Sequence, residues 1–226
     1  MKRQAGEDTA AAPERDGEAA RPQDGTRGRN LPELIVATFL ELTRSRHPNA
    51  ITFRDIAAAA GISHMAPYRH FKSRQELLNR IADIGFGMLA ASLDAVAARH
   101  PKEPRRQIVA ACTCYYRFAA DHPAYAHLMF GTDRALWDKA EPLPSLERTR
   151  AILLRIVHAC QLSGDVPRGI DEKKLLGLLW AHVHGFTLLA ANRVLTEHET
   201  GAPEAFIEAG VRVILAGLGE LGAGPS

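Results

Sequence analysis

Apolar residues recur at three- and four-residue steps along most of the chain, the spacing that places side chains on one face of an α-helix. The first series begins at Leu31, behind the potential cap Asn30, and predicts a helix that ends near Arg46. No alternation typical of strands interrupts the pattern. The sequence therefore predicts an all-α fold, with later helices over residues 52–60, 63–71, 73 to about 100, 104–122, 123–130, 145–162, 171–195 and 203–218.

Two local signals define the second predicted helix. Thr52 is followed three residues later by Asp55, the spacing of a capping box in which each side chain satisfies a backbone N–H of the other residue. Gly61 stands where helices commonly end in a left-handed residue. These signals predict a short helix that starts after Thr52 and ends at Ala60.

The next two predicted helices begin at serine residues. Ser63 is the expected N-cap of a helix that runs to Phe71 and holds Pro67 at about its fourth position, where a missing N–H costs little. Ser73 and Glu76 have the spacing of a second capping box. An apolar stripe then predicts a long fourth helix, formed by Leu77, Leu78, Ile81, Ile84 and Met88.

The organisation into domains follows from where large apolar residues occur. The first 29 residues contain no Leu, Ile, Val or Phe, so they cannot bury enough surface to offset the entropy of ordering. We expect a disordered tail over residues 1–29, in which Arg27 and Arg29 either reach DNA or are merely solvated. Residues 30–76 are expected to form a small three-helix domain, and residues 77–226 a larger C-terminal bundle.

The composition indicates where in the cell the protein is located, but it says little about which kind of molecule the protein binds. A formal net charge of +2 neither requires nor excludes a polyanion. The N-terminus has no apolar export segment, and three cysteines without a CxxC pair favour a reducing cytoplasm. The most apolar stretch, residues 175–191, contains His182, His184 and Thr187, so a buried helix is expected there rather than a membrane span.

Residues 52–71, TFRDIAAAAGISHMAPYRHF, contain what a helix-turn-helix requires: two short helices, a glycine turn, an apolar contact and a polar outer face. Arg54, Lys72 and Arg74 are candidate phosphate ligands, because phosphate contacts supply affinity without sequence information. Base edges would be read by the leading residues of the second helix. The expected outer face consists of His64, Met65, Ala66, Tyr68, Arg69 and His70, of which the first three are the candidate base readers.

The pattern T-x-R-D-I-A-x-x-A-G-[IV]-S-x-x-x-x-Y-x-H-F-x-S-[KR]-x-x-L-L over residues 52–78 resembles the signature of the tetracycline-repressor (TetR) family. The resemblance implies a recognition helix at 63–71, a brace formed by the first helix, and a C-terminal domain for effector binding and dimerisation. Pro67 departs from the family's usual apolar residue, so base preference does not carry over. The DNA contacts that the resemblance implies fall on Thr52, Arg54, Ser63, His64, Met65, Ala66, Tyr68, His70 and Arg74.

The C-terminal half resembles a TetR subtype with a Trp, His and Gly signature, through LLWAHVHGFTLL at 178–189 and FAADHPAYAHLMFG at 118–131. Its aromatic and polarizable residues either line an apolar effector pocket or pack in the core. The candidate pocket residues are Tyr116, Met129, Phe130, Trp137, Trp180 and His184.

The last two predicted helices carry broad apolar surfaces. A stripe of Phe206, Gly210, Ile214 and Gly217 would permit close packing in a symmetric dimer, although burial within one chain is the alternative. Two recognition helices related by a two-fold axis would enter successive major grooves about 34–36 Å apart and read a near-palindrome.

The sequence thus favours a homodimeric, sequence-specific DNA-binding repressor that responds to a small apolar or amphipathic effector. Neither Cys112 with Cys114 nor His182 with His184 has helical spacing suited to one metal-binding face, and no nucleophile with an orienting base is evident. We therefore expect no metal, no cofactor and no enzymatic activity. The alternatives are an all-α enzyme or small-molecule carrier, and a non-specific DNA binder.

Overall fold

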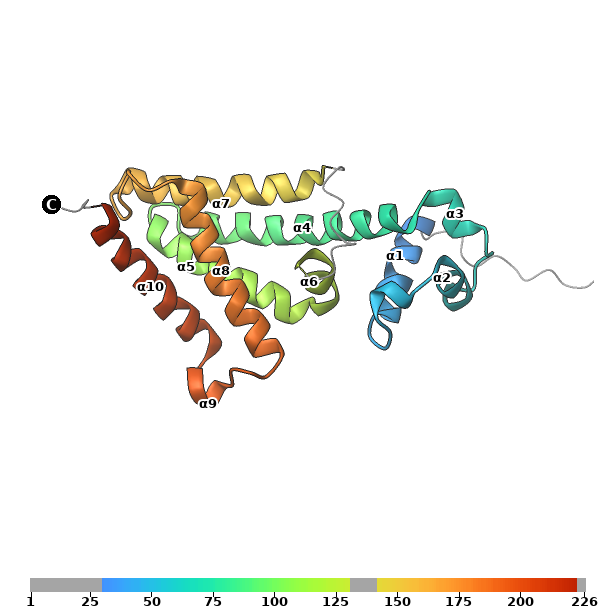
Figure 1. Cartoon of the computed structure of the whole chain (residues 1–226). Helices are drawn as coiled ribbons and strands as arrows, with labels where there is room; N and C mark the ends of the chain where they lie inside the picture. Colours follow the sequence, from blue (N-terminus) through green and yellow to red (C-terminus); the bar gives the residue numbers. More distant parts are fainter. Residues whose placement is uncertain (1–29, 131–141, 223–226) are drawn as a thin grey trace, which may run out of the picture. The chain divides into compact units, whose positions relative to one another are not determined.

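The computed structural model describes residues 30–130 and 142–222, with side chains described as far as Leu218, and this part of the chain contains helices and no strands. The all-α prediction is confirmed. The predicted tail at 1–29 lies outside the described residues. The helices are α1 (Leu31–Leu42), α2 (Phe53–Ala60), α3 (Ala66–His70), α4 (Arg74–Arg99), α5 (Pro104–Asp121), α6 (Pro123–Phe130), α7 (Pro144–Ser163), α8 (Glu172–Ala191), α9 (Glu197–Thr200) and α10 (Pro203–Gly222), with a 3-10 turn η1 (Pro48–Ala50) before α2 (Figure 1).

Most helix ends lie within a few residues of their predicted positions, and the differences have local causes. The first helix ends at Leu42 instead of continuing to Arg46, whose N–H still bonds to the Leu42 carbonyl within a series of turns. The predicted helix 171–195 is in fact α8, which Asp171 caps through its side chain. It is followed by the short α9, which the sequence analysis missed although Thr196 and Glu199 form a capping box at its start.

One apolar core joins the N-terminal helices to the start of α4. Ile35 and Phe39 of α1 and Ile56 of α2 are almost fully buried, and Leu77 and Ile81 of α4 close the same cluster. Each such side chain contributes roughly 1.5–3 kcal/mol by leaving water. The boundary expected between residues 76 and 77 therefore falls inside a continuous helix whose first turns belong to the N-terminal core.

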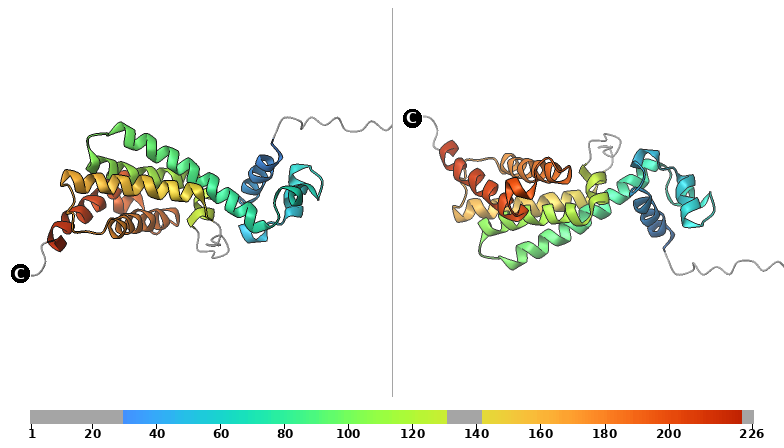
Figure 2. Two further views of the ribbon diagram at one scale, coloured as in Figure 1. Left: turned by 90° about the horizontal axis from the view of Figure 1, so that it is seen from above. Right: turned by 90° about the horizontal axis from the view of Figure 1, so that it is seen from below.

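A second core fills the bundle formed by the rest of α4 with α5, α7, α8 and α10. In Figures 1 and 2 α7 lies along α4, and α8 and α10 cover the bundle from the side of α5. The inner face of α8 consists of Leu175, Leu179, Val183 and Phe186. α4 and α8 are long and apolar enough to cross a membrane, but their inner faces contribute to this core, as the sequence analysis expected for residues 175–191.

The short helix α6 is held against α4 by a close approach at Gly85. A Cβ atom built on Gly85 would lie inside van der Waals contact with the sulfur of Met129 and 3.0 Å from the ring of Tyr125. Met129 is fully buried, and Leu128 beside it belongs to the N-terminal core. α6 therefore contacts both cores, and its close approach to α4 is possible because position 85 has no side chain.

Candidate functional site

The start of α2 has the geometry that its sequence predicts. The Thr52 hydroxyl accepts a hydrogen bond from the Asp55 N–H at 3.2 Å, and the Asp55 carboxylate accepts one from the Thr52 N–H at 2.8 Å. Arg46 pairs with the same carboxylate at 3.1 Å. Hydrogen bonds from Thr52 and Arg46 hold the pKa of Asp55 well below its usual value. Gly61 ends the helix in the left-handed region with φ 66°.

The start of α3 differs from its prediction. α3 begins at Ala66, and its N-terminal cap is Met65, which makes no side-chain hydrogen bond. Ser63 therefore does not cap the helix, and Pro67 is its second residue. A helix capped by Ser63 would need the residue-67 N–H to donate to the Ser63 carbonyl, and proline has none. Instead the Ala66 N–H bonds to that carbonyl at 2.9 Å in a turn.

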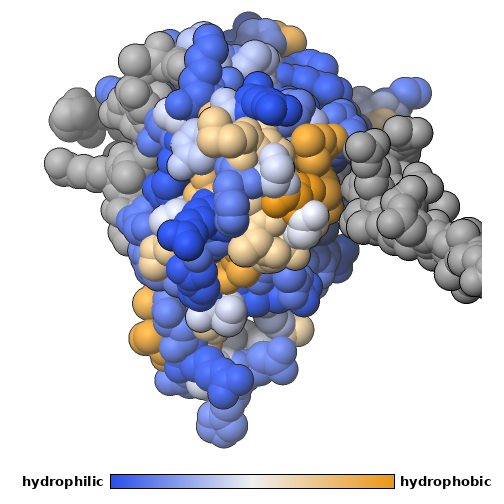
Figure 3. Space-filling view, turned by 90° about the vertical axis from the view of Figure 1, so that its right-hand side faces the viewer, coloured by the Kyte–Doolittle hydropathy of each residue, from blue (hydrophilic) through white to orange (hydrophobic). Residues whose placement is uncertain are grey.

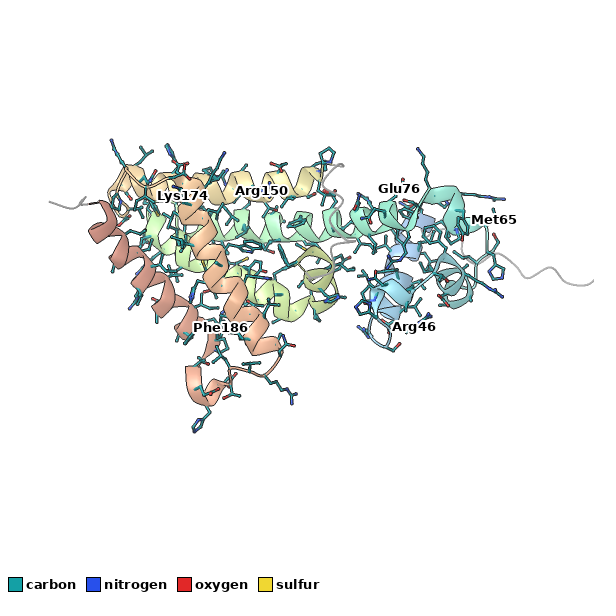
Figure 4. All side chains as sticks on the ribbon, viewed as in Figure 1. Arg46, Met65, Glu76, Arg150, Lys174 and Phe186 are labelled. Carbon is teal, nitrogen blue, oxygen red and sulfur yellow. The ribbon has the colours of Figure 1, made fainter. Side chains whose placement is uncertain are left out.

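The surface around α3 contains most of the predicted outer face. Met65 and Tyr68 are 60% and 55% exposed, and Tyr68 is held edge-on against Phe53 at 4.9 Å between ring centroids. Met65 lies at the outer side of this region in Figure 4, and Figure 3 shows the same end as hydrophilic side chains around an apolar patch. The other exposed predicted residues are Thr52, Arg54, Ser63, His64, Arg69, His70 and Lys72.

Ala66 does not belong to the exposed outer face on which the sequence predicted it. Its side chain is only 7% exposed, because the short α3 turns this position toward the interior together with Pro67. Its side chain is therefore not positioned to read a base edge, contrary to the prediction from the sequence. His64 and Met65 remain exposed in the turn that leads into α3.

Arg74 is half-buried, and its guanidinium forms hydrogen bonds to other residues of the chain. Its guanidinium donates to the carbonyl oxygens of Pro48 at 2.6 Å and Ile51 at 3.3 Å, and to the side-chain oxygen of Asn49 at 3.1 Å. Arg74 thus fixes the start of α4 to the segment before α2, a positioning role that the sequence analysis missed. Nearby, Ser73 caps α4, but the Glu76 carboxylate accepts from the Lys72 N–H at 2.6 Å rather than from the expected Ser73 N–H.

A cluster of aromatic side chains lies in the C-terminal bundle. The Tyr115 hydroxyl is 2.6 Å from Nδ1 of His184, and Trp180 stacks on the His184 ring at 5.2 Å. Phe130 lies 5.3 Å from Tyr115 and 6.0 Å from Trp180 between ring centroids. Burial raises the pKa of Tyr115 and lowers the pKa of His184. Both groups are therefore neutral at pH 7, and the hydroxyl and the imidazole nitrogen share one neutral hydrogen bond.

Beside this cluster lies an apolar cavity of about 50 Å³ between α4, α5, α7 and α8. Trp180 lines it, together with Tyr115, which the sequence analysis did not select. The series Ile108, Ala111, Cys112 and Tyr115 has helical spacing and would have identified Tyr115 as the inner residue.

Tyr116 and Met129 do not line this cavity. Tyr116 packs on Phe186 at 5.6 Å, and Met129 is buried at the contact of α4 with α6. Trp137 lies outside the described residues. Among the residues that the structure describes, no group of His, Cys, Asp or Glu side chains is arranged to hold a metal ion.

The residues of the stripe predicted on α10 pack mainly against other helices of the same chain. Phe206 stacks on Phe186 at 4.9 Å, and a Cβ on Gly210 would collide with the His182 ring. Ile214 packs against the core and Gly217 is exposed. The large apolar side chains that are exposed on α8 and α10 are instead Leu178, Trp180, Leu188 and Leu189 of α8 and Val213 of α10.

Two family models match this chain over more than half of its length. Residues 35–81 match the bacterial regulatory proteins of the tetR family, and residues 108–214 match a tetracyclin repressor-like C-terminal domain. The chain belongs to the TetR family. It is a DNA-binding transcriptional regulator. Neither match specifies the Trp-His-Gly subtype, which stays a prediction. Comparison with curated proteins gives no significant match.

Solved structures share the TetR fold along most of the chain. A protein of unknown function from Rhodococcus sp. RHA1 is 25% identical with a TM-score of 0.72, covering 87% of this chain and 99% of its own. The TetR family transcriptional regulator PfmR from Thermus thermophilus is 19% identical with a TM-score of 0.61, covering 81% and 98%. The regulator FadR from Bacillus subtilis, solved with stearoyl-CoA, is 14% identical with a TM-score of 0.65, covering 82% and 98%.

Proposed function

We propose that this TetR-family protein is a cytoplasmic, ligand-responsive repressor that binds a near-palindromic operator as a homodimer and releases it when a small effector enters the C-terminal bundle. The observation that carries the proposal is the continuity of α4. Its first turns complete the core beneath α3, and its later turns line the cavity beside Tyr115 and Trp180. A ligand that moves α4 in the bundle thereby changes the position of α3.

Direct readout of DNA is assigned to the exposed turn before α3 and to the helix itself. His64 and Met65 are proposed to contact base edges, and Tyr68, Arg69 and His70 to contact bases or phosphates from the same surface. Arg54 and Lys72, both exposed, are proposed phosphate ligands. Arg74 is proposed to act by holding α4 against the segment before α2, because its Nε and one terminal nitrogen already donate to that segment.

Dimerisation is assigned to the outer faces of α8 and α10. Leu178 and Leu189 on α8 and Val213 on α10 are large apolar side chains that are exposed to water in the single chain. The small residues Ala205, Ala209 and Ala216 are also exposed on α10 and would let a partner helix approach closely. A two-fold axis through such a face would orient two α3 helices toward successive major grooves.

The effector is proposed to enter beside Trp180. A cavity of about 50 Å³ is well below the roughly 300–1,000 Å³ of typical ligand sites, so binding must enlarge it. Trp180 is 45% exposed, stacks on His184 and lines the cavity, so it is the side chain we propose a ligand would displace. The lining is almost entirely apolar, and Tyr115, one of the lining residues, hydrogen-bonds through its hydroxyl to His184 beside the cavity. These features suit an apolar or amphipathic ligand.

Selection of bound sites from a random DNA pool tests the repressor function. We expect an enriched near-palindrome whose half-sites are separated by one helical turn or a multiple of it. His64→Ala and Met65→Ala should change the preferred bases, whereas Lys72→Ala should weaken binding to all sequences alike. Recovery of random sequences with equal affinity would contradict the proposal and favour a non-specific DNA binder.

A further inference from the structure

An open groove of about 830 Å³ runs along the outer side of α5 between the second half of α4 and α10. Its floor is formed by half-buried side chains of modest size, Val96 from α4 and Val109, Ala110 and Cys114 from α5. A floor of this kind accepts an apolar body without hydrogen-bonding demands.

The rim of the groove is strongly basic. It carries five arginines against two acidic residues, Asp121 and Glu208. Three of the arginines have acidic partners: Arg106 pairs with Glu103 at 2.8 Å, Arg117 with Glu204 at 3.2 Å, and Arg212 with Glu208. The remaining two are Arg99 and Arg105.

Arg99 and Arg105 are exposed, and no acidic side chain in the described ranges lies within 4 Å of either. They lie at the end of α4 and the start of α5, so both are at the same end of the groove. Guanidinium groups bind carboxylates and phosphates through paired N–H donors. This end of the groove therefore has two cations available for an anionic group.

The groove is separate from the inner cavity, although the same two helices line both. On α5, Ile108, Cys112 and Tyr115 face the cavity, whereas Val109 and Cys114 face the groove. On α4, Leu89 and Leu93 line the cavity and Val96 and Arg99 line the groove. A ligand in the groove would contact α4 without touching Trp180.

We propose that this groove binds an organic anion with an apolar body, in which a carboxylate or a phosphate monoester pairs with Arg99 and Arg105 and the body lies on the floor between α4 and α5. The volume of the groove is within the range of small-molecule sites. The site goes beyond the proposed function, because it requires neither DNA nor the inner cavity, and its test fails or succeeds independently of DNA release.

Calorimetric titration of the full chain with octanoate, octyl phosphate and neutral octanol tests the site. We expect saturable one-site binding of at least one anion, and whichever anion binds more tightly identifies the headgroup. The double variant Arg99→Gln/Arg105→Gln should weaken that binding about tenfold, the effect of losing about 1.4 kcal/mol. Ala95→Trp, at an exposed position on the groove wall, should block it by occupying the floor.

Two controls locate the site. Lys173→Gln/Lys174→Gln removes the same charge from exposed positions on α8 and should leave binding unchanged. Trp180→Ala, at the inner cavity, should also leave it unchanged. The proposal is overturned if octanol binds as tightly as the anions, if the arginine double variant binds them with unaltered affinity, or if neither anion binds.

Discussion

The phenolic oxygen of Tyr115 lies 2.6 Å from Nδ1 of His184, and this hydrogen bond joins α5 to α8 across the C-terminal core. Tyr115 is buried, whereas its neighbour Tyr116 is half-buried on another face of α5. The contact makes the polar end of an otherwise apolar region, so its removal should affect both stability and ligand preference.

Tyr115→Phe should lower the free energy of unfolding by about 0.5–1.5 kcal/mol, because it leaves Nδ1 of His184 without its hydrogen-bond partner. Tyr116→Phe is the matched control, since it removes the same atom from a hydroxyl that has no protein hydrogen-bond partner among the described residues. Urea denaturation followed by circular dichroism measures both. Equal losses in the two variants would contradict the assigned role of the hydrogen bond.

The pKa of His184 should make stability depend on pH. Burial lowers this pKa in the folded state below its unfolded value of about 6.5, so the unfolded chain binds the proton first as the pH falls. The stabilisation is complete above about pH 6.5 and is lost as the pH falls through the folded-state pKa. We expect the free energy of unfolding to decrease from pH 7 to pH 5.5, and to decrease less in His184→Gln. Parallel pH profiles would rule this out.

Arg74→Ala should destabilise the N-terminal core rather than remove a phosphate contact. Loss of hydrogen bonds to Pro48, Asn49 and Ile51 should cost about 1–2 kcal/mol, after allowance for the partial exposure of the guanidinium. The control Lys72→Ala should instead leave stability unchanged and reduce the slope of log affinity against log salt by about 0.9. An Arg74→Ala protein of native stability with the same reduced slope would show that Arg74 binds phosphate.

Gly85→Ala should destabilise the contact of α4 with α6. The added methyl group would collide with the buried side chain of Met129, and such overpacking typically costs about 1–3 kcal/mol. Gly87→Ala on the same helix meets only Ser145 at 3.4 Å and should be neutral or stabilising by up to about 1 kcal/mol. Thermal denaturation of the two variants would reveal the difference, and a stable Gly85→Ala protein would mean that α6 can move.

Val213→Glu should separate the dimer without unfolding the chain. Val213 is 72% exposed, so a carboxylate there stays hydrated in the monomer but would be buried in the proposed interface. Sedimentation velocity should show a monomer, and the circular dichroism spectrum should match that of the native protein. Leu162→Glu, at an exposed position on α7, is the control and should remain dimeric. A dimeric Val213→Glu protein would place the interface elsewhere.

The local signals in the sequence predicted much of the fold, because caps act within a few residues. Thr52 with Asp55 and Gly61 fixed the limits of α2, and the two prolines at 104 and 123 marked the starts of α5 and α6. The prediction for α3 was wrong for an equally local reason. Pro67 removes the first hydrogen bond of a helix capped by Ser63, and this consequence could have been derived from the sequence.

The candidate sites were less predictable, because the role of a side chain depends on residues far along the chain. Arg74 has the sequence features of a phosphate ligand, yet its guanidinium donates hydrogen bonds to carbonyl groups more than twenty positions earlier in the chain. Phe206 and Gly210 have the spacing of an interface stripe, yet Phe186 and His182 pack against them.

The sequence by itself determined an all-helical chain, the position of the helix-turn-helix and the family to which it belongs, since these depend on periodicity, caps and a contiguous motif. Only the tertiary structure decided which of those helical faces are free. Ala66 is buried whereas Met65 is exposed, and Tyr115 rather than Tyr116 lines the cavity. Neighbours in sequence differ in this way because successive side chains on a helix point about 100° apart. The helices that pack against it from elsewhere in the chain bury the side chains on one face and leave the others exposed.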